Sequence, residues 1–108
     1  MEAKHRKRKT YKTEAGTEPV LDWMRSIGHL PEVLGKIFER LDRAEEGNFG
    51  VHESVGQGVI ELKIDFGPGY RVYLGIDGEE IILLWGGTKK TQDTDIKRAR
   101  KYWEDYNA

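Results

Sequence analysis

The spacing of the apolar residues changes near the middle of this chain, and that change limits the folds open to it. Between residues 19 and 46, apolar side chains recur every three or four positions, which is typical of amphipathic helices. Between residues 60 and 85, they alternate with polar side chains or form an unbroken run, which is typical of strands. Helices followed by a series of strands predict an α+β domain.

Two helices are predicted before the change of spacing. The first begins near Thr17, because Pro19 is tolerated in an opening helical turn. Its apolar face consists of Val20, Trp23, Met24 and Ile27. Gly28 and Pro31 mark a short loop to a second helix that continues to Gly47. We expect the two helices to form an antiparallel hairpin.

Three strands are predicted after the change of spacing. Residues 60–66 alternate apolar and polar side chains, and the tight turn Gly67-Pro68-Gly69 leads back into a strand over residues 70–76. Asp77-Gly78 is a hairpin signal. The apolar run 81–85 then predicts the central strand.

The remaining segments complete a β-α-α-β-β-β-α order. Residues 47–58 are rich in glycine and show no apolar period, so we expect a loop. A last helix follows Thr91, with Asp93 and Asp95 favoured in its first turn by the helix dipole. We therefore expect an antiparallel meander sheet with the helices packed on one side.

The charges form two basic clusters, although the net charge of the chain is −1. Residues 1–12 contain six basic residues and one acidic residue, and residues 86–103 contain six basic and two acidic residues. Such clusters favour a surface that binds a polyanion, and solvated faces are the alternative. The first cluster is either an edge strand over residues 4–13, protected by its basic side chains, or a flexible basic tail over residues 1–9.

Length and composition exclude several classes of protein. The 108 residues provide material for a single domain, residues 1–108. The chain lacks cysteine, an apolar run near the ~20 residues of a membrane span, and an apolar segment after its basic start, so we expect a soluble cytoplasmic protein. His5, His29 and His52 are scattered, so we expect neither a metal site nor another cofactor.

A polar face of the predicted sheet is the candidate site. Lys63 and Arg71 flank the tight turn on neighbouring strands, and Lys89 follows the central strand. Cleavage of RNA by internal transesterification requires a deprotonated 2′-hydroxyl, a stabilised pentavalent phosphate and a protonated 5′-oxygen. The guanidinium fork suits the second requirement. Ordinary cross-strand pairing of Arg71 with Glu61 or Asp65 is the alternative interpretation.

Two long motifs resemble the phage-derived, HigB-like killer proteins of the RelE/ParE superfamily. They are Glu61-Leu62-Lys63-Ile64-Asp65-Phe66-Gly67-Pro68-Gly69-Tyr70-Arg71-Val72-Tyr73 and Gly86-Gly87-Thr88-Lys89-Lys90-Thr91-Gln92-Asp93-Thr94-Asp95-Ile96. The opening pattern of Tyr11, Thr13, Gly16, Pro19 and Trp23 is similar as well. The resemblance implies a RelE-like fold and the toxin of a type II toxin–antitoxin module, a ribosome-dependent, metal-independent mRNA endoribonuclease (mRNA interferase) that inhibits translation.

The resemblance also implies roles for individual residues. By position, Lys63 matches a catalytic lysine, Arg71 a phosphate-binding arginine and Lys89 a basic residue after the last strand. Glu61 stands where RelE has a second lysine and is expected to act as a base. The residues expected to contact RNA are Tyr73, Lys90, Arg6 and Arg8. No residue matches the tyrosine or histidine that transfers protons in many relatives.

The implied partners are a cognate helix-turn-helix antitoxin, mRNA and the ribosome, with no membrane, and the chain is expected to be monomeric when free of antitoxin. Two alternatives from other functional classes stay open. One is a ParE-like topoisomerase inhibitor without nuclease activity, and the other is a non-catalytic module that binds RNA or an antitoxin.

Overall fold

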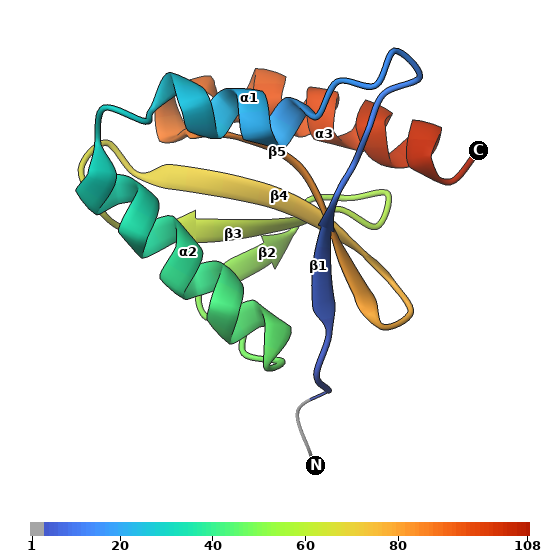
Figure 1. The fold of residues 1–108 in the computed structure, drawn as a ribbon, viewed down its shortest axis with the longest axis horizontal. Coiled ribbons are helices and arrows are strands. Elements are labelled where there is room, and N and C mark those ends of the chain that lie inside the picture. Colours follow the sequence, from blue (N-terminus) through green and yellow to red (C-terminus); the bar gives the residue numbers. More distant parts are fainter. Residues whose placement is uncertain (1–3) are drawn as a thin grey trace.

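A five-stranded mixed sheet lies between helices in the computed structural model, which describes residues 4–108 (Figure 1). The elements are β1 (Lys7–Thr10), α1 (Pro19–Ser26), α2 (Pro31–Glu45), β2 (His52–Ser54), β3 (Ile60–Ile64), β4 (Tyr70–Asp77), β5 (Glu80–Thr88), the 3₁₀ turn η1 (Lys89–Thr91) and α3 (Gln92–Tyr106). The predicted α+β class is confirmed.

The strands lie in the order β1-β5-β4-β3-β2, so the predicted meander forms one part of a larger sheet. Strands β3, β4 and β5 pair antiparallel, whereas β1 pairs parallel to β5, and the expectation of a purely antiparallel sheet is wrong. Strand β2 lies within the predicted loop 47–58 and pairs with β3. Because Lys7–Thr10 form an edge strand, the alternative of a flexible tail over residues 1–9 is wrong for residues 7–9. Residues 1–3 lie outside the described residues.

Helices α1 and α2 cover one face of the sheet. Figure 1 shows them spreading apart from the loop that joins them, so the expected antiparallel hairpin is wrong. Both begin with a proline, Pro19 and Pro31, which lack the N–H that a first helical turn leaves unbonded. The core on this face includes Val20 and Met24 of α1, Ile37 and Leu41 of α2, and Leu62, Val72, Leu74 and Leu83 of the sheet.

Helix α3 covers the opposite face, so the expectation that all helices lie on one side is wrong. The central strands are apolar on both faces and therefore need two layers of cover. Ile82 and Leu84 of β5 are buried against Ala99 and Trp103 of α3. The sheet is therefore the middle layer of three.

Two sheet glycines make room for tryptophan rings, one on each face. A Cβ atom on Gly86 would lie 2.2 Å from the Trp23 ring of α1, and one on Gly75 would lie 2.5 Å from the Trp103 ring of α3. Both rings are largely buried and pack directly on the strand backbone at these glycines. The glycines thus set how closely α1 and α3 approach the sheet.

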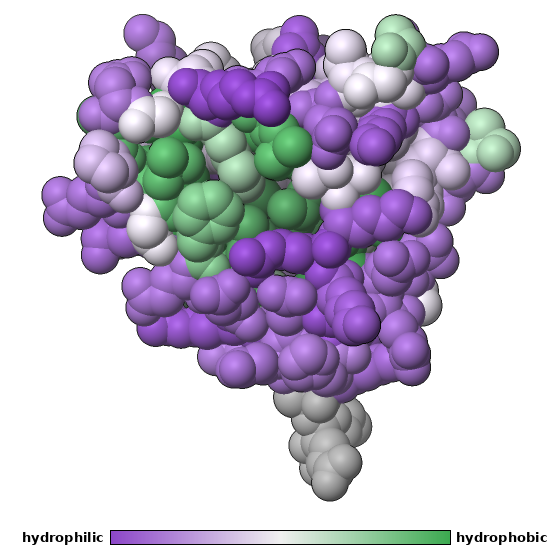
Figure 2. All heavy atoms as spheres, viewed as in Figure 1, coloured by the Kyte–Doolittle hydropathy of each residue, from purple (hydrophilic) through white to green (hydrophobic). Residues whose placement is uncertain are grey.

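The surface seen in the orientation of Figure 1 is apolar between α1 and α2 and polar around that area (Figure 2). Phe38 of α2 is 42% exposed, and Leu21 and Leu34 are partly buried against the core below. None of the helices in residues 4–108 is long and apolar enough to cross a membrane.

Candidate functional site

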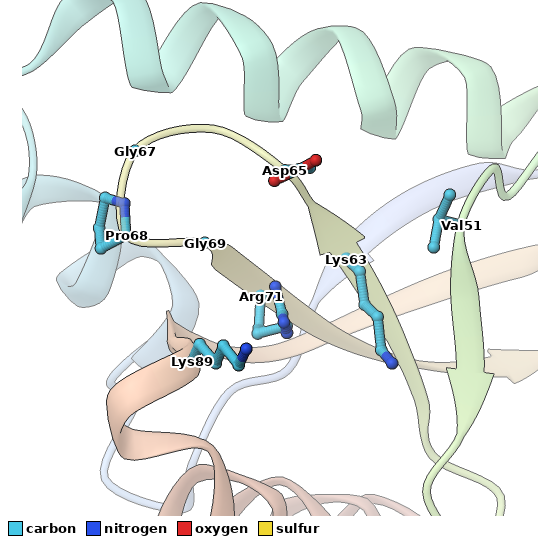
Figure 3. A pocket seen from close by; sticks show the side chains of 8 residues that line it. All are labelled: Val51, Lys63, Asp65, Gly67, Pro68, Gly69, Arg71 and Lys89. Atoms are coloured by element: carbon cyan, nitrogen blue, oxygen red, sulfur yellow. The ribbon is translucent and has the colours of Figure 1, made fainter.

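A basic cleft of about 580 Å³ opens where β3 ends, β4 begins and β5 runs into η1 (Figure 3). Its lining consists of Val51, Lys63, Asp65, Gly67, Pro68, Gly69, Arg71 and Lys89. The structure therefore brings together three of the four residues predicted to be catalytic: Lys63, Arg71 and Lys89. Three cationic side chains around one cleft favour an anionic ligand.

Strand register and a glycine turn hold these cations beside one another. Lys63 of β3 pairs directly with Arg71 of β4, so both side chains leave the same face of the sheet. The Lys89 amide donates a hydrogen bond to the Gly69 carbonyl at 2.8 Å, which ties η1 to the turn before β4. Gly69 has φ +82°, and a Cβ atom there would lie 3.4 Å from Arg71 Nη1. Glycine at this position thus adopts the positive φ of the turn and leaves space for the Arg71 guanidinium.

The Arg71 side chain is largely buried and retains an unused hydrogen-bond donor. Its residue is 9% exposed, so the expectation that it lies on a wet face is wrong. Nη1 donates to the Tyr70 carbonyl at 3.1 Å, and Nε lies 3.9 Å from Glu61 Oε1. Within residues 4–108, Nε has no hydrogen-bond partner. A buried donor without a partner is rare in folded proteins and calls for an explanation such as a ligand.

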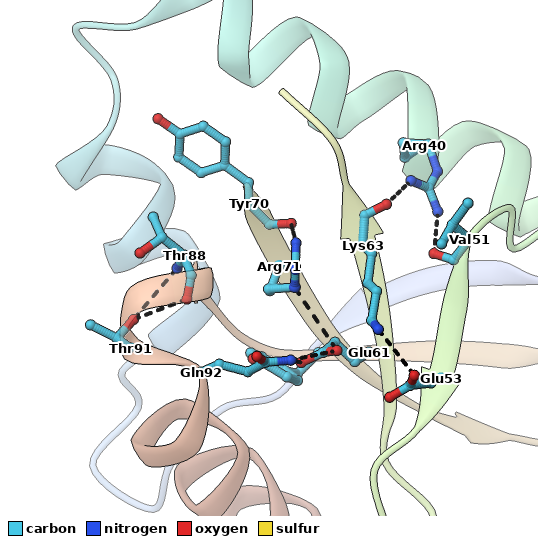
Figure 4. Close-up of polar contacts among 11 residues, drawn as sticks. Arg40, Val51, Glu53, Glu61, Lys63, Tyr70, Arg71, Thr88, Thr91 and Gln92 are labelled. Carbon is cyan, nitrogen blue, oxygen red and sulfur yellow. Dashed lines mark hydrogen bonds and ion pairs between the residues drawn. The ribbon is translucent and has the colours of Figure 1, made fainter. Parts of the chain in front are cut away.

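Glu61 lies behind Arg71 and is completely buried (Figure 4). Its carboxylate accepts hydrogen bonds from the Tyr73 hydroxyl at 2.9 Å and from Gln92 Nε2 at 3.0 and 3.1 Å. Because both carboxylate oxygens are enclosed, the structure contradicts the expectation that Glu61 acts directly on RNA as a base. The side chain can instead balance the charge of Arg71.

Tyr73 is fully buried, so the expectation that it contacts RNA is wrong. Burial and the adjacent Glu61 carboxylate raise the pKa of the Tyr73 hydroxyl well above its usual range. The hydroxyl therefore remains a hydrogen-bond donor at neutral pH. Together with Gln92 of α3, it links the sheet to the helix behind the cleft.

The two lysines lie nearer to solvent than Arg71. Lys63 Nζ pairs with Glu53 Oε1 of β2 at 3.0 Å, and its side chain is 28% exposed. Lys89 is exposed. Arg40 of α2 donates to the carbonyls of Lys63 and Val51, which fastens β3 to the segment before β2 (Figure 4). This contact fixes the backbone from which the lysine extends.

The remaining residues predicted to bind RNA do not line the cleft. Arg8 forms ion pairs with Asp42 and Glu45 of α2 at 2.8 and 2.9 Å. Arg6 donates to the carbonyl of Gly78, 3.3 Å away. Lys90 is exposed in η1, next to Lys89 but outside the cleft lining.

Gln92, Val51 and Asp65 belong to the site although no role was predicted for them. Asp65 is two residues after Lys63 in the alternating segment, so strand spacing contained a signal for it. Figure 3 shows its carboxylate turned away from Arg71 and Lys89, at the rim of the cleft. Gln92 and Val51 reach the site through tertiary packing, for which the sequence contained no signal.

His52 does not line the cleft, although it follows Val51 in the chain. Its Nδ1 lies 2.7 Å from the Gly50 carbonyl oxygen, and its ring packs edge-on against Phe49. Across the described part of the chain, no three His, Asp or Glu side chains are grouped so as to hold a metal ion.

A comparison with known proteins gives one relative. Over 79 residues, the chain is 48% identical to a protein of Haemophilus influenzae whose name is given as "Uncharacterized protein", and the match covers 72% of this chain and 79% of that protein. No protein-family profile matches the chain. No solved structure matches it either.

Proposed function

We propose, for a chain that belongs to the same family as the Haemophilus influenzae protein, that the basic cleft binds an RNA phosphodiester and cleaves it. In this proposal the protein is the toxin of a type II toxin–antitoxin module and acts in the cytoplasm as a ribosome-dependent mRNA endoribonuclease. The observation that carries the proposal is the convergence of three cationic side chains, Arg71, Lys63 and Lys89, on one cleft.

The cleft supplies what a dianionic phosphorane needs. The 2′-hydroxyl gives its proton to water as its oxygen attacks phosphorus, which places additional negative charge on the equatorial oxygens. The bond from phosphorus to the 5′-oxygen then breaks, and the 5′-oxygen takes a proton from water. Arg71 can donate to those oxygens through a guanidinium whose position is already fixed, so little reorganisation accompanies the reaction. Lys63 and Lys89 add point charges at the same cleft. The products would be a 2′,3′-cyclic phosphate and a 5′-hydroxyl.

Glu61 is a positioning residue in this proposal. Its buried carboxylate lies 3.9 Å from Arg71 Nε and holds the guanidinium beside the cleft by charge attraction. Tyr73 and Gln92 donate hydrogen bonds to the carboxylate, which fixes its position behind the guanidinium.

The RelE-like topology is part of the same proposal. Support comes from the order of the elements: an N-terminal strand, two helices, the antiparallel strands β3, β4 and β5, and a terminal helix. Further support is that Arg71 and Lys89, one from each motif, both line the cleft. A cognate antitoxin and the ribosome are the proposed partners.

Cleavage mapping on translating ribosomes tests the proposal. Purified protein is added to ribosomes that translate a defined message, and the RNA ends are identified chemically. We expect discrete cuts with 2′,3′-cyclic phosphate and 5′-hydroxyl ends, and no cuts with Arg71→Gln. Lys36→Ala is the control, because Lys36 is an exposed cation of α2 outside the cleft lining.

Intact messages would overturn the nuclease assignment. If double-strand DNA breaks accumulated instead in cells that express the chain, the topoisomerase inhibitor would replace it. If the protein bound RNA without cutting RNA or breaking DNA, the non-catalytic binding module would replace it.

A further inference from the structure

The two basic clusters of the sequence meet on one face of the folded chain, where β1 lies beside α3. The Tyr11 ring, just after β1, stacks on Tyr102 of α3 with ring centroids 5.0 Å apart. The Tyr11 hydroxyl donates to Asp105 at 2.6 Å. Lys9 Nζ lies 5.9 Å from the ring centroid of Tyr106. Segments about 90 residues apart in sequence are thus held side by side.

The alternation of β1 divides its cations between two faces. Arg8 turns toward α2, where Asp42 and Glu45 neutralise it. Lys7 and Lys9 leave the other face of the strand, together with Tyr11. Only the lysines therefore contribute to the surface beside α3.

Two adjoining hollows follow this junction. The first, about 690 Å³, is lined by residues that include Lys7, Lys9, Lys12 and Tyr106, and the second, about 570 Å³, by residues that include Lys97, Arg98, Lys101 and Tyr102. Tyr102 and Tyr106 lie one turn apart on α3, so the hollows are neighbours. Apart from Arg8, which α2 neutralises, six basic residues line them, against the two acidic residues Glu18 and Glu80.

We define the β1–α3 face as Lys7, Lys9, Lys12, Lys97, Arg98 and Lys101. Within the described residues, none of these six forms an ion pair. The Arg98 guanidinium carbon lies 4.7 Å from the centre of the Trp85 ring, which holds the cation without neutralising it. The positive charge of this face is therefore available to an external anion.

The composition of the face favours a nucleic acid over an acidic protein. Protein interfaces are depleted in lysine and depend on buried apolar or aromatic anchors. The large apolar residues that the described chain exposes, Phe38 and Val51, are not part of this face. The two tyrosines that line its hollows are already engaged within the chain, Tyr102 by stacking on Tyr11 and Tyr106 by its hydrogen bond to Asp77. Lysine-rich surfaces without such anchors bind phosphates regardless of base sequence.

We infer that the β1–α3 face is a second RNA-binding surface, which docks on the phosphate backbone without reading bases; the choice of RNA rests on the proposed function. Helix α3 connects this face to the cleft. It begins at Gln92, hydrogen-bonded to Glu61 behind the cleft, and Lys97 and Lys101 follow about 8 and 14 Å further along its axis. A trinucleotide bound in the cleft can contact only the near end of the face, whereas a long strand can cover it.

Affinity for RNA of two lengths tests the inference. Binding of polyuridine and of a trinucleotide is measured by fluorescence anisotropy at several salt concentrations. For a variant with both Lys97→Ala and Lys101→Ala, we expect ~10-fold weaker polyuridine binding and a salt slope shallower by about 1.4, since each lost phosphate contact in a single strand removes ~0.7. Trinucleotide binding should weaken less than polyuridine binding, because a short ligand leaves most of the face unoccupied. A matched control, Arg25→Ala with Lys36→Ala, removes two exposed cations from α1 and α2 and should bind polyuridine like the wild type.

Equal polyuridine affinity in the test and control variants would overturn the inference, as would tighter binding of polyglutamate than of polyuridine. Its failure is distinguishable from that of the proposed function. If substitution of the face weakens polyuridine binding but the wild-type protein never cuts RNA, the RNA-binding face is supported and the nuclease assignment is wrong. If the wild-type protein cuts RNA but the test and control variants bind polyuridine equally, the nuclease assignment is supported and the inference about the face is wrong.

Discussion

Arg71 Nε lies 3.9 Å from Glu61 Oε1, near enough for an ion pair and too far for a hydrogen bond. Tyr73 and Gln92 supply the hydrogen bonds of the carboxylate instead. Glu61 therefore balances the charge of the guanidinium, but Arg71 Nε has no hydrogen-bond partner within residues 4–108. The charge of Arg71 is thus balanced from behind, while the same residue lines the cleft with Lys63 and Lys89.

Replacing Arg71 should therefore abolish cleavage while the chain still folds. For Arg71→Gln we expect a loss of ~100-fold or more in cleavage rate, since a preorganised donor is removed. The free energy of unfolding should fall by about 1–3 kcal/mol, because Glu61 keeps its other two donors. Single-turnover cleavage and urea unfolding measure the two effects. A folded variant that cleaves at the wild-type rate would remove Arg71 from the mechanism.

The two lysines should matter less than Arg71. We expect Lys63→Ala and Lys89→Ala each to lower the cleavage rate by ~10-fold, since a point charge is more replaceable than a fork. Stability should change little, because the Lys63–Glu53 pair is partly exposed. Glu53→Gln is the control: it breaks that pair and leaves the Lys63 charge in place. If either lysine variant cleaved RNA at the wild-type rate, that lysine would have no role in the reaction.

Glu61→Gln separates positioning from direct proton transfer. The amide has nearly the same shape and can still accept a hydrogen bond from Tyr73, so we expect a folded protein with ~10-fold slower cleavage. If Glu61 only positions Arg71, the pH profile of the remaining activity keeps its shape. If the carboxylate were the base, its replacement would remove the limb of the profile at low pH. Measuring cleavage of wild type and variant across pH decides between the two roles.

Tyr11 makes stability depend on alkaline pH. Burial, with the hydrogen bond to Asp105, raises the pKa of Tyr11 from 10.0 to about 12. Its neutral form is thus favoured in the folded state, and the stability it contributes is complete below pH 10.0 and lost as pH rises toward about 12. The difference in unfolding free energy between wild type and Tyr11→Phe should shrink across that window. A difference that stayed constant across the window would contradict the assignment.

Strand spacing in the sequence predicted the cation cluster well. Lys63 and Arg71 flank the short connection 65–69, which allows little freedom of register, and they pair directly in the sheet. The exposed three-residue strand β2 contains no apolar alternation and was therefore missed. Its pairing with β3 depends on contacts that form only after the chain has folded.

Burial of the polar face was the larger error. Glu61 and Tyr73 alternate with apolar residues, and such alternation predicts exposure. They can be buried because they hydrogen-bond to each other and α3 covers them. Gln92 of α3 donates further hydrogen bonds to the Glu61 carboxylate. The alternation of apolar and polar residues cannot show whether two polar side chains 12 positions apart hydrogen-bond to each other or face solvent.

Close packing at Gly86 gives the last prediction. A Cβ atom at this position would lie 2.2 Å from the Trp23 ring, so Gly86→Ala forces α1 away from β5 or drives the indole from its site. We expect a loss of about 1–3 kcal/mol in the free energy of unfolding, the usual cost of overpacking. Gly35→Ala is the matched control, because Gly35 is exposed within α2 and a Cβ atom there would have no neighbour within 4 Å. That control should gain up to ~1 kcal/mol, because alanine favours the helix. Urea unfolding of both variants measures the contrast, and equal stability of the two would show that Trp23 does not fix the distance between α1 and the sheet.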